Sequence, residues 1–156
     1  MPVSFVLTDA TGEFGGTVVG EDGVKRLVLY RVHGPLRQVA FVDGLYPQDT
    51  WSGKNVTYTR HDCRGGTLEI EVQSDSALFD EPNILSIRMG GRVTDRVIVD
   101  PLVTSVQARF PLESEDGKCV VRFEVDRTAI PREVTDGENP DPRELGLHFN
   151  RFTYRP

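Results

Sequence analysis

Three aromatic residues, Tyr46, Trp51 and Tyr58, flank a short polar stretch whose composition suits sugar binding. Trp51 is the only tryptophan of the chain, and it stands among polar and turn-forming residues. An aromatic ring can stack on the apolar C–H face of a pyranose, while neighbouring carboxylates and amides such as Asp49 and Asn55 bind its hydroxyls. The stretch therefore predicts a carbohydrate site, although a tryptophan folded back over one end of a core would leave the same pattern.

Cys63 and Cys119 are the only cysteines. A disulfide between them would close a loop of about 56 residues and stabilise the fold by roughly 4 kcal/mol in the chain-entropy model. Such a bond would place the chain in an oxidising compartment. Two unconnected, buried thiols in a cytosolic protein fit the spacing equally well.

The remaining candidate chemistry is weaker. The histidines, His33, His61 and His148, do not stand at metal-ligand spacing, and no Cys-x-x-Cys is present, so we expect no zinc site. The loop carboxylates Asp136, Glu138 and Asp141 could hold Ca²⁺, but they lack the spacing of an EF-hand, and solvated loop charge explains them as well.

We expect the chain not to be an enzyme. It contains no Gly-x-Ser-x-Gly, no phosphate-binding loop and no dinucleotide-binding glycine pattern. Carboxylates such as Glu69, Glu71 and Glu124 are frequent enough for a glycosidase pair, but they fall on the polar faces of predicted strands, and nothing singles out two of them.

The elements that must position these residues are strands. Val, Ile and Thr number 20, 5 and 12, against 5 Ala, which favours an all-β fold because β-branched side chains suit a pleated surface. Residues 67–73 and 118–126 alternate apolar and polar side chains, as half-buried antiparallel strands do. Turn signals separate strand candidates at 3–8, 17–19, 24–33, 36–43, 56–60, 67–73, 84–89, 92–100, 105–110, 118–126 and 147–154.

We therefore predict a single domain spanning residues 1–156, an antiparallel β-sandwich of jelly-roll type with about ten strands and one or two short helical turns. Gly34-Pro35 and Gly90-Gly91 are predicted hairpin turns. The helical turns are expected at 74–79 and 141–146, where Asp141 would cap the turn and Gly146 would close it in the left-handed conformation.

Charge and hydropathy exclude some classes of binding partner. The formal net charge of −6, with no run of Lys or Arg, argues against binding nucleic acid. No apolar run approaches the roughly 18 residues of a membrane-spanning helix. The first residues lack the features of a signal peptide, so we expect an extracytoplasmic protein of this sequence to be a segment or processed product of something larger.

From Trp51 onward, several short motifs resemble a known family. They include Cys63-Arg64-Gly65-Gly66-Thr67-Leu68 and the closing Asp141-Pro142-Arg143-Glu144-Leu145-Gly146-Leu147-His148-Phe149. About two thirds of the chain is similar to the jelly-roll, carbohydrate-binding-like domains attached to polytopic membrane glycosyltransferases of bacterial cell envelopes. The chain carries neither the transmembrane part nor the glycosyltransferase part, so a direct role in sugar transfer is not expected.

The resemblance implies a non-catalytic module outside the cytoplasm or at the cell surface, part of a larger protein, with a cell-envelope glycan as ligand. It favours the Cys63–Cys119 disulfide, and its partners would be a membrane glycosyltransferase or a second copy of the chain. The alternatives are a structural or protein-interaction β-sandwich, a glycoside-active enzyme and a cytoplasmic location. The predicted sugar-binding residues are Tyr46, Asp49, Trp51, Asn55, Tyr58, Arg143, His148 and Asn150.

Overall fold

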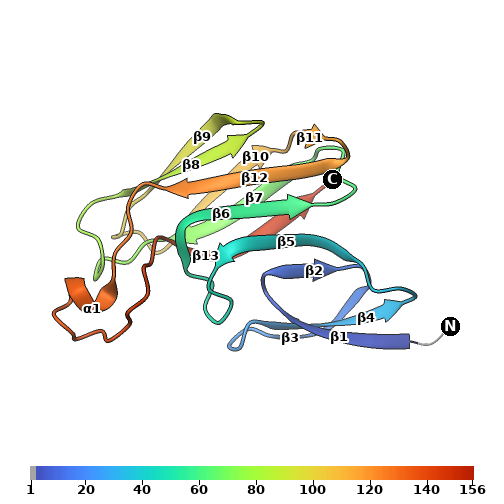
Figure 1. The fold of residues 1–156 in the computed structure, drawn as a ribbon, viewed down its shortest axis with the longest axis horizontal. Helices are drawn as coiled ribbons and strands as arrows, with labels where there is room; N and C mark the ends of the chain where they lie inside the picture. Colours follow the sequence, from blue (N-terminus) through green and yellow to red (C-terminus); the bar gives the residue numbers. More distant parts are fainter. Residues whose placement is uncertain (1–2) are drawn as a thin grey trace.

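A computed structural model describes residues 3–156, and the chain is all-β. Within these described residues, thirteen strands and one four-residue helix, α1 (Pro131–Val134), make up the regular structure (Figure 1). Every strand pairing within its sheets is antiparallel. The predicted antiparallel β-sandwich is therefore confirmed.

Two sheets form the sandwich. The seven-stranded sheet runs in the order β2 (Gly12–Phe14), β5 (Gln38–Leu45), β6 (Ser52–Arg60), β12 (Lys118–Val125), β8 (Asn83–Met89) and β9 (Arg92–Val99), with β11 (Ser114–Glu115) paired to β12. The facing sheet has three strands, β10 (Val106–Pro111), β7 (Thr67–Gln73) and β13 (His148–Arg155). Figure 1 shows the chain crossing between the two sheets from β6 to β7 and again from β12 to β13.

The core lies between these sheets and follows the alternation of their strands. In β7 the residues Leu68, Ile70 and Val72 are fully buried while the residues between them are half-exposed. Phe123 on β12 packs edge-on against Phe110 and Phe149 of the facing sheet, with ring centroids 5.9 and 5.7 Å apart. Apolar burial of this kind is the main favourable term in folding, so these strands hold the two layers together.

A third sheet, here called the N-terminal sheet, consists of β1 (Val3–Asp9), β4 (Leu27–His33) and β3 (Thr17–Asp22) in the order β1-β4-β3. In Figure 1 it lies beside β2 and β5, outside the sandwich. Tyr30 and Val32 of β4 are buried, and Tyr30 packs edge-on against Phe14 of β2. The opposite face leaves Phe5 and Leu7 more than half exposed.

Two turn predictions have different outcomes. Gly90-Gly91 joins β8 to β9 as the expected hairpin. Gly34-Pro35 does not join a hairpin, because β4 belongs to the N-terminal sheet and β5 to the seven-stranded sheet. Proline has no N–H to donate and fits this crossing between sheets as well as it fits a turn.

The prediction of two helical turns is also partly wrong. Residues 76–78 form a turn in which Asp75 Oδ1 accepts the N–H of Ala77, so a cap operates near the expected place. Residues 141–146 are not helical: the chain bends at Arg143, and Leu145 and Ala129 exchange both backbone hydrogen bonds at 2.8 Å. Asp141 does accept the N–H of Arg143 at Oδ1, at 2.9 Å, as the predicted cap would. The short helix forms earlier, at Pro131, a residue preorganised for the first helical position.

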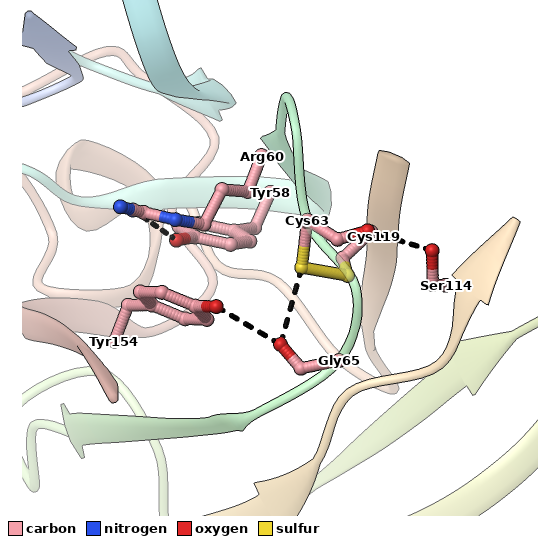
Figure 2. Close-up of a disulfide and its surroundings, with 7 residues drawn as sticks. All are labelled: Tyr58, Arg60, Cys63, Gly65, Ser114, Cys119 and Tyr154. Carbon is pink, nitrogen blue, oxygen red and sulfur yellow. Dashed lines mark hydrogen bonds between the residues drawn. A yellow bond between two sulfur atoms is a disulfide. The ribbon is translucent and has the colours of Figure 1, made fainter. Parts of the chain in front are cut away.

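Cys63 and Cys119 form a disulfide, with their Cα atoms 5.6 Å apart. It ties the β6–β7 connection to Cys119, the second residue of β12 (Figure 2). Ser114 donates a hydrogen bond to the carbonyl of Cys63, and Tyr154 donates one to the carbonyl of Gly65 at 3.0 Å. The covalent link and these bonds fix one end of the sandwich.

Candidate functional site

Five of the eight predicted site residues gather at the other end of the sandwich. Tyr46, Asp49 and Trp51 come from the β5–β6 connection, Arg143 comes from the segment before β13, and His148 is the first residue of β13. We call these five residues the Arg143 cluster. All five side chains are half-buried.

The backbone brings the two segments together at Ser52 and Gly146. The N–H of Gly146 donates to the carbonyl of Ser52 at 2.7 Å, and the N–H of Leu147 donates to Ser52 Oγ at 3.0 Å. A Cβ on Gly146 would lie 2.6 Å from the carbonyl oxygen of Gly53, so only glycine fits this close approach. Gly146 is therefore required for the close approach of the two segments. The prediction that it closes a turn in the left-handed conformation is wrong, because its φ is not positive.

Arg143 is held between two carboxylates. Its Nη2 donates to Asp49 Oδ2 and to Asp141 Oδ2, each at 2.6 Å, its Nη1 donates to Asp49 Oδ1 at 3.1 Å, and its Nε donates to Asp141. The guanidinium also lies over the ring of Tyr46, 4.7 Å from the ring centroid. Four of the five N–H donors of the guanidinium are used in this way, and no group among residues 3–156 accepts from the fifth, on Nη1.

This arrangement keeps both carboxyls ionised. The side-chain hydrogen bond from Arg143 lowers the pKa of Asp141 and outweighs the opposing effect of partial burial. For Asp49, burial alone would raise the pKa, but hydrogen bonds from Arg143 and from the backbone of Trp51 outweigh it and lower the pKa. The hydrogen bonds that Arg143 donates to Asp141 and Asp49 in turn raise the pKa of Arg143. The cluster thus carries fixed charges at neutral pH.

Trp51 packs beside His148, with ring centroids 5.4 Å apart and the planes inclined by 36°. Nε2 of His148 lies 2.6 Å from the carbonyl oxygen of Asp49, to which it donates. Burial lowers the pKa of His148, so its imidazole is neutral at pH 7. Trp51 and Tyr46 also lie against a small buried cluster of Leu78, Phe79, Ala129 and Leu145.

Thr50 was not singled out by the sequence, yet it shapes this loop. Its φ is 59°, a left-handed conformation that is rare for a β-branched residue. Its N–H donates to the carbonyl of Tyr46, and its hydroxyl donates to the carbonyl of Phe149, both at 2.7 Å. These bonds hold the strained residue and present Asp49 and Trp51 on either side of it. No local sequence signal marks such a residue, because the bond to Phe149 spans 99 positions.

The other three predicted residues lie elsewhere. Tyr58 is 3% exposed and stacks on Phe152 inside the core, so it offers no face to a sugar, contrary to the prediction. Its hydroxyl accepts from Arg60, whose guanidinium lies 3.8 Å from the ring centroid of Tyr154 (Figure 2). Asn150 donates to Gln73 at 3.4 Å on the facing sheet. Asn55 is exposed on β6, on the outer face of the seven-stranded sheet.

No metal site accompanies the cluster. Among residues 3–156, no three His, Cys, Asp or Glu side chains converge in a way that could hold a metal ion. Asp141, one of the three residues considered for Ca²⁺ with Asp136 and Glu138, directs its carboxylate to Arg143 instead. No helix in the described part of the chain has the length and apolar character needed to cross a membrane.

Comparisons with known proteins give distant similarities of structure. No family model and no curated protein matches the sequence. The sugar-binding C-terminal domain of EclA is 12% identical, with a TM-score of 0.47, over 81% of this chain and 82% of that one. The enzymatically active domain of bacteriophage CBA120 tailspike protein 4 is 15% identical, with a TM-score of 0.32, over 98% of this chain and 19% of that one. Neither score reaches 0.5, and neither assigns a function to this chain.

Proposed function

We propose that the chain is a non-catalytic carbohydrate-binding module that acts at the bacterial cell envelope and binds its glycan at the Arg143 cluster. The observation that carries the proposal is a guanidinium fixed between Asp49 and Asp141, beside the half-buried rings of Tyr46 and Trp51. The cluster joins apolar ring surface to polar groups whose directions are set before a ligand arrives.

A sugar needs both kinds of contact. The ring surface of Trp51 suits the C–H face of a pyranose, and its partner His148 holds the ring in one orientation. The free N–H of Arg143 and the remaining lone pairs of the Asp49 carboxylate, which is 35% exposed, suit neighbouring hydroxyls. Preorganised groups of this kind lose little side-chain freedom on binding.

The electrostatics favour binding over hydrolysis. A glycosidase needs one carboxylic acid whose pKa is raised so that it can donate a proton to the leaving oxygen. In the Arg143 cluster the pKa values of Asp49 and Asp141 are both lowered. Neither residue can therefore serve as the general acid near neutral pH, which supports a non-catalytic role.

The disulfide supports the extracytoplasmic part of the proposal. Structural disulfides persist in oxidising environments and are rare in the cytosol. The Cys63–Cys119 bond is fully buried, as expected of a structural one. Together with the resemblance to domains attached to membrane glycosyltransferases, it favours a module carried outside the cytoplasm by a larger envelope protein.

The decisive experiment is a glycan array followed by titration calorimetry on the best glycan, using Trp51→Ala and Trp51→Leu. Leucine keeps apolar contact with the small cluster of Leu78 and Phe79 but removes the flat ring. We expect both variants to weaken binding by about tenfold or more, because stacking and the apolar area of the ring are lost. The leucine variant should keep most of the thermal stability.

The matched control is Phe5→Ala, which removes an aromatic ring that is 62% exposed on the N-terminal sheet. It should leave glycan binding unchanged. If no glycan binds the wild type, or if Trp51→Leu binds as well as the wild type, the Arg143 cluster is a structural clamp for the β5–β6 connection and the proposal fails.

A further inference from the structure

The outer face of the seven-stranded sheet carries two rows of polar side chains that include none of the five residues of the Arg143 cluster. In one row, Arg122 of β12 lies directly between Thr57 of β6 and Arg88 of β8. In the next row, Glu124 lies between Asn55 and Ser86. The alternate residues of these strands, such as Val56, Phe123 and Ile87, are buried in the core, so both rows face outward.

The direct pairing of Arg122 with Arg88 is unfavourable by itself. Opposite residues of antiparallel strands have Cβ atoms about 5 Å apart, and like charges in this position destabilise a sheet. Glu124 offsets part of the charge, because its carboxylate lies 3.4 Å from Nε of Arg88. Among residues 3–156, no carboxylate forms an ion pair with Arg122.

The arginine pair also lies where the surface is hollowed. Two neighbouring hollows, of about 260 and 990 Å³, share Arg88 and Arg122 in their linings. The smaller one adds Asn55, Thr57 and Glu124. The larger one extends past Lys118 toward Glu115 and Asp116, which lie at the β11–β12 turn.

These groups match one class of ligand. Guanidinium groups bind a carboxylate through two parallel hydrogen bonds, and two arginines side by side present donors for both of its oxygens. Beside them, the amide of Asn55, the hydroxyl of Thr57 and the carboxylate of Glu124 suit sugar hydroxyls. The part of the net charge of −6 that lies more than about 8 Å away opposes an anion only weakly, because it is screened at physiological salt. Four carboxylates line the hollows themselves; Glu124 is paired with Arg88 and Glu113 with Arg92, and Glu115 and Asp116 lie at the far end of the larger hollow.

We propose that this face binds an acidic sugar, a uronic acid residue whose carboxylate is held by Arg88 and Arg122. This site shares the ligand class of the proposed function but uses none of the residues of the Arg143 cluster. The carboxylate would supply the negative charge that Arg122 lacks. The chain would then distinguish acidic from neutral glycans on a second surface.

The test is a calorimetric titration at fixed ionic strength with sodium glucuronate, glucose and sodium sulfate as three separate probes. We expect glucuronate to bind at least tenfold more tightly than either of the others, because only glucuronate offers both a carboxylate and hydroxyls. Arg122→Gln and Arg88→Gln should each weaken glucuronate binding at least tenfold. Without ligand, Arg122→Gln should melt no lower than the wild type, because it removes a repulsion.

The matched control is Arg151→Gln, an exposed arginine on β13 of the facing sheet, which should bind glucuronate as the wild type does. Equal affinity for glucuronate and glucose, or for glucuronate and sulfate, would overturn the proposal, as would unchanged binding by Arg122→Gln.

The variants also separate this site from the Arg143 cluster. Loss of glucuronate binding in Trp51→Ala with retention in Arg122→Gln would place the ligand at the cluster, and this inference would fail while the proposed function stood. If glucuronate binding depends on Arg122 while no array glycan binds through Trp51, this inference would stand and the proposed function would fail.

Discussion

At the scale of single residues, the ion pairs of Arg143 make the stability of the chain depend on acid. The pKa values of Asp49 and Asp141 are lowered in the folded chain and return to about 3.9 when unfolding removes Arg143. A carboxyl whose folded pKa is lowered contributes stability that is complete above about pH 5 and is lost as pH falls through the folded pKa. We therefore expect the urea midpoint of the wild type to decrease progressively as the pH is lowered below about 5.

The double variant Asp49→Asn/Asp141→Asn tests the origin of this effect. It should be less stable than the wild type at pH 7 and should lose less stability on acidification, because the two shifted groups are gone. Asp136→Asn is the control, since Asp136 is exposed and asparagine tolerates its positive φ of 50°. If the double variant shows the same acid dependence as the wild type, the pair with Arg143 does not hold the carboxyls ionised.

The residues of the cluster were partly predictable from the sequence. A single tryptophan among turn residues, followed far along the chain by Asp-x-Arg, marked both halves of it. Tyr58 was misassigned although the strand alternation contained the answer, since Val56 and Tyr58 are two apart and share the inward face. The proximity of Asp49 to Arg143 was beyond local pattern, because the bond spans 94 positions.

At the scale of elements, the disulfide connects the β6–β7 connection with β12, two elements that do not follow one another in the chain. Replacing both cysteines with serine releases a loop closed over 56 positions and should lower the free energy of unfolding by about 4 kcal/mol in the chain-entropy model. Urea unfolding followed by circular dichroism measures the difference. A reductant should destabilise the wild type similarly and leave the serine variant unchanged, and equal midpoints for variant and wild type would contradict the prediction.

The long strands were predictable because their core contacts impose the alternation. β7 and β12 lie within one residue of their expected bounds. The short strands β2 and β11 were missed, since three and two residues are too few to show a period. The segment 141–146 was misread as a helical turn because Ala129, the partner of Leu145, precedes α1 in the chain. Capping signals describe local preference, and backbone pairing with a distant residue outweighs them.

At the scale of the whole molecule, the N-terminal sheet contacts the rest of the chain through few groups. The ring centroids of Tyr30 and Phe14 of β2 lie 6.1 Å apart. In the connection between β3 and β4, Arg26 Nη2 lies 3.1 Å from Nε2 of His148, the first residue of β13. A cavity of about 270 Å³ lies between the N-terminal sheet and the sandwich, lined by Tyr30 on one side and by Tyr58 and Phe152 on the other. Whether this sheet unfolds with the sandwich depends on whether the contacts around the cavity outweigh the entropy gained by local unfolding.

We expect one cooperative transition, because the inner face of β4 buries Tyr30 and Val32, which local unfolding would expose to water. Trp51 fluorescence reports on the sandwich end and far-ultraviolet circular dichroism on all strands, so the two urea curves should coincide. Tyr30→Ala should shift both curves equally to lower urea, since it removes a buried ring from the shared interface. A circular dichroism transition that precedes the fluorescence change, and that alone moves in Tyr30→Ala, would show instead that residues 3–33 form a separately unfolding unit, against the single domain predicted for residues 1–156.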